Sequence, residues 1–328
     1  MERNSTTSKE ANCCFFSTPQ LDHVMVPVLV VEFMLGLMSN LIALWMFASQ
    51  KIWKSHSVYL AHLTTADAVL MLCLPFRADY YIKSRNWIYG SVFCQIDLFM
   101  LSTCRAAGIF FLTTVAIDRY FKILHPQHRI NRMGLRCING ICCGLWLLIF
   151  TMNIYLFTGN HLINLQCETF TICMDFSLLH VWSDIFFILQ FAIPAGIVSF
   201  CTYSITAHLR NNTVNSMGRI SRAVYFVMAV ALVFIFCYLP STVSRLAVLI
   251  LKALYDDCSH FHGASVVFYY LICLTYFNSA LNPVLYYFSS PAFNRTVRNF
   301  FCKLFGKETQ DAQSNNGNDS VAPNGNAK

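Results

Sequence analysis

The chain contains 328 residues, of which 56% are apolar, 15% aromatic and only 12% charged. Average soluble proteins carry about 25% charged residues, so this composition argues against a conventional soluble domain. The net charge of +7 raises the question of a nucleic-acid partner. We expect no such partner, because no basic patch is interleaved with solvent-facing aromatic residues.

Seven long apolar segments follow one another along the chain, at 24–48, 57–82, 91–124, 136–157, 180–209, 218–251 and 264–288. A helix of about 20 apolar residues spans a hydrocarbon core of about 30 Å. The segments are apolar nearly all round rather than on one face, which is typical of membrane helices. We predict an all-α membrane protein with a seven-transmembrane helix bundle at 24–288, preceded by an extracellular N-terminal segment at 1–23.

The connecting segments differ in positive charge. Those on one side contain thirteen lysine and arginine residues, and those on the other contain five. The positive-inside rule then predicts an extracellular N-terminus and a cytoplasmic C-terminus. We expect a multi-pass protein of the plasma membrane. Residues 1–20 lack the apolar stretch of a signal peptide, so we expect the first span to direct insertion. On the outer side, Asn4 is the candidate glycosylation site.

The fifteen cysteines fall into two groups. Nine lie in the predicted helices or at the inner face, where free cysteine is usually a small apolar residue. Six lie at or beyond the outer ends of the helices: Cys13, Cys14, Cys94, Cys167, Cys173 and Cys258. Six cysteines in an oxidising compartment favour three disulfides, with 15 connectivities open. The alternative, a zinc site, lacks CxxC or histidine spacing, and we expect no metal or cofactor.

Several polar and proline residues interrupt the apolar spans. Asp67 lies midway along the second span, and Asp118, Arg119 and Tyr120 close the inner end of the third. Charged residues inside a membrane are costly and therefore indicate function. Prolines interrupt the last three spans, and each removes a helical hydrogen bond and favours a kink: Pro194, Pro240 and Pro283.

This pattern resembles the class A (rhodopsin-like) G-protein-coupled receptors over about residues 20–305. The matching residues are Asn40, Asp67, Asp118, Arg119, Tyr120, Trp146, Pro194, Pro240, Asn282, Pro283 and Tyr286. The resemblance implies a disulfide between Cys94 and Cys167, and no enzymatic activity.

Residues 74–81, 98–105 and 286–291, with the adjacent pair Cys13 and Cys14, look like the hydroxycarboxylic acid receptors and the related oxoeicosanoid receptor. In that group such a pair staples the N-terminal segment over the pocket. The resemblance implies the pairs Cys13–Cys173 and Cys14–Cys258, and the assignment within Cys13 and Cys14 stays open.

Three arginines lie in the outer halves of the predicted helices: Arg77, Arg105 and Arg245. Arg105 follows Cys94 by eleven residues, which is about 16 Å along a helix. A guanidinium at that depth needs an anion or a polar network. We expect Arg105 to bind a ligand carboxylate bidentately, a geometry that suits a guanidinium but not an ammonium. The alternative is internal pairing with Glu32, Asp79, Asp97 or Asp184.

In hydroxycarboxylic acid receptors the matching arginines hold the carboxylate, and a residue matching Tyr276 also contacts the acid. The resemblance therefore implies a receptor for a carboxylate-bearing small molecule or lipid. Three arginines favour a short hydroxy acid, whereas residues 98–105 lean towards the oxoeicosanoid-like sequences and a long acidic lipid. A peptide or another non-acidic ligand remains the alternative.

Activation in the family requires the inner half of the sixth span to move about a helix kink. Tyr238 stands where most members carry Trp, just before Pro240. We expect Asp118 to hold Arg119 at rest and to release it towards the G protein. The resemblance implies an inhibitory G protein that lowers cAMP, with arrestin and receptor kinases as further partners.

Three departures from the family pattern limit this transfer. Thr202 stands where a tyrosine in the family often stabilises the active state. Gly108 replaces a serine that in many relatives forms a sodium site with Asp67, so sodium binding is in doubt. Asn282 replaces the aspartate common among hydroxycarboxylic receptors, which leaves the subfamily open.

Beyond the last span, the segment 289–305 is predicted to form a short amphipathic eighth helix on the membrane surface. Its Cys302 is either a palmitoylation site or a free thiol. Residues 306–328 are rich in Asn, Gly and Ser and are predicted to be a disordered cytoplasmic tail.

Two other classes of membrane protein, transporters or channels and intramembrane enzymes, fit the sequence less well. A transporter or channel would need a hydrated polar path across the membrane. An even number of spans or an internal repeat would favour a transporter, and the sequence shows neither. An intramembrane enzyme would need a motif such as HExxH, GxSxG or a P-loop, and none is present.

Overall fold

The computed structural model describes residues 19–50, 53–157, 162–163, 165–168, 178–211, 217–255 and 258–289. Its long helices are α1 (Pro19–Ala48), α2 (Ser55–Ile82), α3 (Ser91–Leu124), α4 (Leu135–Asn153), α5 (Leu178–Asn211), α6 (Met217–Leu254) and α7 (Cys258–Ser289). Short elements are the 3₁₀ helices η1 (Arg129–Arg132) and η2 (Ile154–Phe157) and the strands β1 (Leu162–Ile163) and β2 (Gln166–Cys167).

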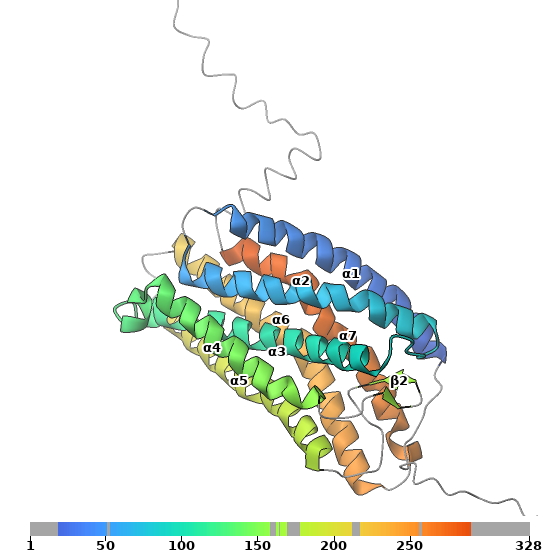
Figure 1. The fold of residues 1–328 in the computed structure, drawn as a ribbon. Coiled ribbons are helices and arrows are strands. Elements are labelled where there is room, and N and C mark those ends of the chain that lie inside the picture. Colours follow the sequence, from blue (N-terminus) through green and yellow to red (C-terminus); the bar gives the residue numbers. More distant parts are fainter. Residues whose placement is uncertain are drawn as a thin grey trace, which may run out of the picture.

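The seven long helices lie side by side in one bundle, with the two strands at one end (Figure 1). Each of the seven is long and apolar enough to cross a membrane. Their outward faces carry large exposed apolar side chains, such as Leu72, Leu147 and Phe236. Such a surface suits lipid rather than water. The predicted all-α bundle of seven spans is confirmed.

The helices extend further than their apolar cores. α1 begins at Pro19, five residues before the predicted start, and α7 begins at Cys258, six residues before it. Pro19 at a first helical position has no N–H to leave unpaired, and Asp22 in the first turn suits the positive end of the helix. The predicted fourth span at 136–157 changes to 3₁₀ geometry at Ile154.

Buried side chains form two clusters. One, which includes Phe111, Val115 and Phe234, packs the middle and far half of the bundle. The other, which includes Tyr80 and Trp87, packs the half nearer the strands. Buried polar groups also join helices, since the Asn40 amide in α1 donates to the Ser279 carbonyl oxygen in α7 at 3.1 Å. Such bonds help to hold helices together in a bilayer, because lipid tails are as apolar as the side chains and the hydrophobic effect does not drive the helices together.

The strand pair is tied to the bundle by the disulfide Cys94–Cys167, which joins the first turn of α3 to β2. β1 and β2 are antiparallel, with Leu162 opposite Cys167. The pairing implied by the family resemblance is confirmed.

Several predictions fall outside the described residues. These are the glycosylation site Asn4, the pairs Cys13–Cys173 and Cys14–Cys258 with the side chain of Cys258, the amphipathic helix with Cys302, and the tail at 306–328.

Candidate functional site

A cavity of about 80 Å³ lies at the end of the bundle that carries the strands. Arg77, Arg105, Arg245 and Tyr276 all line it. They come from α2, α3, α6 and α7, four helices that the sequence separates widely. The structure thus brings together the four residues that the sequence singled out for ligand binding. Apolar residues complete much of the wall: Met25, Leu29, Leu98, Leu101, Phe268 and Ile272.

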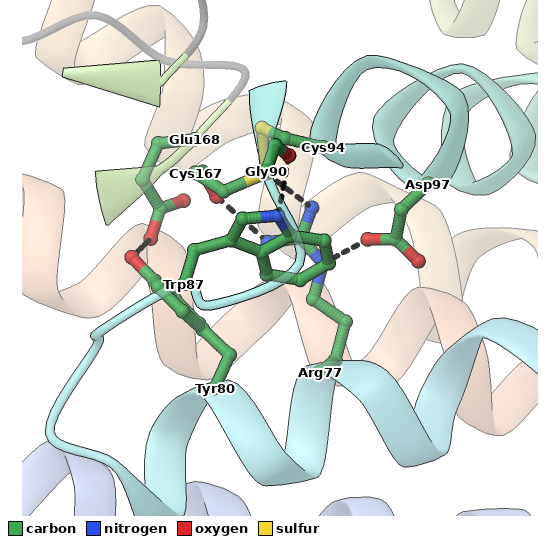
Figure 2. The surroundings of a disulfide bond; sticks show 8 residues. All are labelled: Arg77, Tyr80, Trp87, Gly90, Cys94, Asp97, Cys167 and Glu168. Carbon is green, nitrogen blue, oxygen red and sulfur yellow. Dashed lines mark hydrogen bonds and ion pairs between the residues drawn. A yellow bond between two sulfur atoms is a disulfide. The ribbon is translucent and has the colours of Figure 1, made fainter. Parts of the chain in front are cut away.

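Arg77 is occupied by protein partners. Its Nε lies 2.7 Å from Asp97 Oδ2, and one of its terminal nitrogens donates to the Cys167 carbonyl oxygen at 2.8 Å. Figure 2 shows the guanidinium between Asp97 and the disulfide, behind the indole ring of Trp87 in this view. Arg77 therefore ties α2 to α3 and to the strand pair.

Asp79 was one of the candidate partners for the three arginines in the sequence analysis. Asp79 is instead paired with Lys83, at 2.7 Å, and accepts a hydrogen bond from Tyr89. Residues two apart on a helix do not face each other, whereas residues four apart do. Asp97, also named as a candidate, reaches Arg77 from the neighbouring helix.

Arg245 is also paired. Its Nη2 and Nε contact Asp184 Oδ1 at 2.5 and 2.9 Å, and Asp184 lies in α5. Both side chains are almost fully buried. The pair joins α5 to α6 beside the cavity, and the charge of Arg245 is neutralised before any ligand enters.

Arg105 differs from the other two arginines. It is 5% exposed, and among the described residues no carboxylate forms an ion pair with it. Its Nη2 is 3.4 Å from Thr242 Oγ1, near the limit for a hydrogen bond, and its Nε has no hydrogen-bond partner. A guanidinium has five N–H donors, so most of its hydrogen-bonding capacity is unused.

The ring of Phe187 lies against the guanidinium groups of both Arg105 and Arg245. The Arg105 guanidinium carbon is 3.8 Å from the ring centroid, and that of Arg245 is 4.8 Å from it. Cation–π contacts of this kind stabilise a buried cation without neutralising it. Phe187 was not identified from the sequence, where one more aromatic residue in an apolar span carries no distinguishing signal.

Glu168, the residue directly after Cys167, also lines the cavity and was missed from the sequence. It accepts a hydrogen bond from the Tyr80 hydroxyl at 2.9 Å (Figure 2). Burial raises the pKa of this carboxyl, and the nearby charges of Arg77 and Arg85 oppose that shift. Its position next to the disulfide cysteine was the only available clue.

Below the cavity, Tyr238 links Arg105 to a polar network. Thr242 Oγ1 donates to the Tyr238 carbonyl oxygen at 2.8 Å, and the Tyr238 hydroxyl accepts from the Asn278 amide at 2.7 Å. The hydroxyl packs so closely on Gly108 that a Cβ there would overlap it. The space where many relatives carry serine is therefore filled by the tyrosine.

Asp67 lies at the centre of that network. Its two oxygens accept from Ser279 Oγ at 2.7 Å and from the Asn282 amide at 2.5 Å. One turn further, the Tyr286 hydroxyl is 2.6 Å from Thr64 Oγ1. α7 continues through position 283, the predicted proline interruption, to Ser289.

The inner end of α3 differs from the expectation. Asp118 accepts from Ser55 Oγ at 2.8 Å and is paired with Lys122 at 2.8 Å. No ion pair joins it to Arg119 within the part of the chain described, and the Arg119 guanidinium lies over the Phe226 ring at 4.9 Å. The expected ion pair between Asp118 and Arg119 is therefore not seen in this structure, where Asp118 is paired with Lys122 instead. Lys122 is four residues along the same helix face, and adjacent residues point apart.

Tyr120, the third residue of the motif, packs against Phe200 of α5, with ring centroids 5.7 Å apart. Pro240 lies inside α6, two residues after Tyr238. In the described ranges, no group of His, Cys, Asp and Glu side chains is placed to hold a metal ion.

Comparisons with known proteins agree with this architecture. Residues 39–286 match the model of the family described as "7 transmembrane receptor (rhodopsin family)". The chain is 42% identical to hydroxycarboxylic acid receptor 1 of Homo sapiens over 299 residues, which is 89% of this chain and 83% of that protein. It is 38% identical to hydroxycarboxylic acid receptor 2 of Rattus norvegicus over 318 residues, covering 94% and 87% of the two chains.

A third relative is the 12-(S)-hydroxy-5,8,10,14-eicosatetraenoic acid receptor of Mus musculus, 35% identical over 328 residues, or 96% of this chain and 100% of that protein. The matched family consists of membrane receptors rather than enzymes, and its members couple to heterotrimeric G proteins. The chain belongs to the rhodopsin family of seven-transmembrane, G-protein-coupled receptors, and within it is related to the hydroxycarboxylic acid and eicosanoid receptors.

Proposed function

We propose that this receptor is activated by a small molecule that carries a carboxylate, and that Arg105 binds the carboxylate. The observation that carries the proposal is the contrast among the three cavity arginines. Arg77 and Arg245 are ion-paired with Asp97 and Asp184, whereas no carboxylate of the described chain pairs with Arg105.

A ligand carboxylate supplies what Arg105 lacks. A hydrogen bond to a charged group contributes about 1.5–3 kcal/mol, which corresponds to roughly 10- to 150-fold in affinity. A neutral analogue gives up this contribution and leaves the buried cation uncompensated. The cavity therefore selects for acids over their amides or alcohols.

Glu168 gives the ligand a second feature. Its carboxyl group lines the same cavity and accepts hydrogen bonds from protein hydroxyls. A ligand hydroxyl is a matching donor. The names of the three relatives above each refer to a hydroxy acid. A hydroxy acid fits both groups, with the acid on Arg105 and the hydroxyl towards Glu168.

Cavity size favours a short acid over a long lipid. A volume of about 80 Å³ accommodates a molecule of a few heavy atoms without rearrangement. A long-chain oxo or hydroxy fatty acid would have to part the helices to bury its tail. Because Arg77 and Arg245 are already neutralised, we assign one carboxylate to the ligand rather than two, with Tyr276 as a further contact.

Signalling proceeds from Arg105 through Thr242 and Tyr238 to the kink at Pro240. When the ligand draws Arg105 away from Thr242, one polar contact between α3 and α6 is lost. The part of α6 beyond the kink then moves, and the polar network of Asp67, Asn282 and Tyr286 repacks. At the far end, Arg119 becomes available to the G protein.

We place the cavity on the extracellular side of the plasma membrane and the Asp118–Tyr120 end in the cytoplasm, in keeping with the distribution of Lys and Arg. The coupling partner is an inhibitory G protein. The test is a panel of short hydroxy acids, long-chain hydroxy and oxo fatty acids, and their amides, applied to cells that express the receptor. A short hydroxy acid should lower cAMP in a pertussis-toxin-sensitive way, and its amide should not. A panel in which amides act as well as acids would refute the proposal.

A further inference from the structure

A second and larger hollow lies away from the ligand cavity, on the outer face of the bundle between α2 and α4. Its volume is about 440 Å³. The lining residues of α2 and the segment before it are Trp53, Val58, Ala61, His62 and Thr65, and those of α4 are Leu135 and Asn139. We call this hollow the α2–α4 groove.

The groove lies within one half of the membrane thickness. α2 begins at Ser55 and α4 at Leu135, so both helices start at this end of the bundle. Asn139 lies about 6 Å along α4 and Thr65 about 15 Å along α2, at a rise of 1.5 Å per residue. The groove therefore extends from the membrane surface to roughly the middle of a hydrocarbon core of about 30 Å.

Polar groups in the groove are unusual for a lipid-facing surface. Asn139 and Thr65 are exposed although they lie within predicted spans. His62 is held in place because its Nδ1 accepts from the Trp146 indole N–H at 3.4 Å and its ring stacks on Phe111. A neutral histidine that accepts at Nδ1 carries its proton on Nε2. The groove thus offers N–H donors from His62 and Asn139.

The mouth of the groove is positively charged. Lys54 and Arg136, next in sequence to the lining residues Trp53 and Leu135, are both exposed. The carboxylates of the described chain in this half of the bundle, Asp67 and Asp118, are buried and bound elsewhere. No described carboxylate is therefore available there to neutralise the two cations.

We propose that the α2–α4 groove binds one anionic phospholipid, with an acyl chain along the apolar wall and the headgroup at Lys54 and Arg136. The phosphate and ester oxygens of such a lipid accept from donors such as His62 and Asn139 and match the cationic mouth. A sterol carries a single hydroxyl and no charge, and would leave Lys54 and Arg136 without a partner. In the orientation proposed above this is the cytoplasmic leaflet, where anionic lipids are concentrated.

The test uses the full-length receptor in nanodiscs of phosphatidylcholine with increasing phosphatidylserine. Native mass spectrometry counts the lipids that remain bound, and thermal unfolding reports stabilisation. We expect one retained phosphatidylserine. The rim variant Lys54→Gln/Arg136→Gln should weaken its binding roughly 30-fold, as expected for two basic residues at about 1 kcal/mol each. Thr65→Phe, which fills the groove at an exposed position, should abolish retention while the rim charges stay intact.

The matched control is Arg129→Gln/Arg210→Gln, which removes two exposed cations from the same end of the bundle but outside the groove. It should retain the lipid as the parent does. The proposal is overturned if the control loses the lipid as readily as the rim variant, if phosphatidylcholine is retained equally well, or if cholesterol displaces phosphatidylserine. Lipid retention and thermal unfolding are both measured without agonist, so the result is independent of the ligand cavity.

Discussion

Replacing Gly108 by alanine tests the packing between α3 and α6 below the cavity. The new methyl group would overlap the Tyr238 hydroxyl, and the Tyr238 ring is buried with 1% exposure. Overfilling a packed core costs about 1–3 kcal/mol. Displacing the hydroxyl from Asn278 costs about 1 kcal/mol more. Alanine gains up to about 1 kcal/mol over glycine in a helix, which offsets part of this loss. We expect a net destabilisation of about 1–3 kcal/mol.

A double variant isolates the cause. Tyr238→Phe removes the hydroxyl, and the nearest remaining atoms to a Cβ at position 108 are the Asn278 amide nitrogen at 3.4 Å and the Tyr238 ring carbon at 3.6 Å. Gly108→Ala should then cost little in the Tyr238→Phe background, and the two changes should be strongly non-additive.

Thermal unfolding of the purified, ligand-free receptor measures these effects. The matched control is Gly140→Ala, a helical glycine of α4 with no atom within 4 Å of its added Cβ, which should leave the unfolding temperature unchanged or raise it. If Gly108→Ala is as stable as Gly140→Ala, or if Tyr238→Phe does not rescue it, the described contact is wrong.

Three further predictions concern charged residues. Asp184→Asn removes the carboxylate that neutralises the buried Arg245 charge, which costs about 3–5 kcal/mol. The unfolding temperature should fall, and Arg245→Gln in the same chain should partly restore it. Arg77→Gln should lower thermal stability and surface expression, and any loss of signalling should be no larger than this loss explains. A loss of acid potency in a variant as stable as the parent would contradict the structural role of Arg77. Burial raises the pKa of Glu168, so its protonated form is favoured in the folded state and its contribution to stability is lost as pH rises through the folded-state pKa. The unfolding temperature of the parent should therefore gain more than that of Glu168→Gln when the pH falls from 7.5 to 5.5, and an equal change in both would refute this.

The sequence predicted the membrane architecture well because its signal is coarse. An apolar stretch of membrane length needs no information on packing to be recognised, and all seven stretches form helices. The helix ends were less predictable. Pro19 and Asp22 lengthen α1 through local effects at a helix terminus, and those residues lie outside the apolar stretch.

The partners of the charged residues were only partly predictable. Asp97 and Asp184 were both among the candidates for the arginines, but the sequence could not choose between Asp79 and Asp97 for Arg77. That choice depends on how α2 and α3 are rotated towards each other. Contacts such as Phe187 against Arg105 are decided by packing alone, and nothing in the spacing of the residues indicates them.

The most direct test of the account is a paired measurement on Arg105. An active short hydroxy acid and its primary amide are titrated against the parent receptor and Arg105→Gln, at matched surface expression. We predict that the acid loses about 10- to 150-fold in potency on the variant, as expected for one charge-assisted contact, while the already weak amide changes little. Full potency of the acid on Arg105→Gln would contradict the claim that this guanidinium binds the ligand.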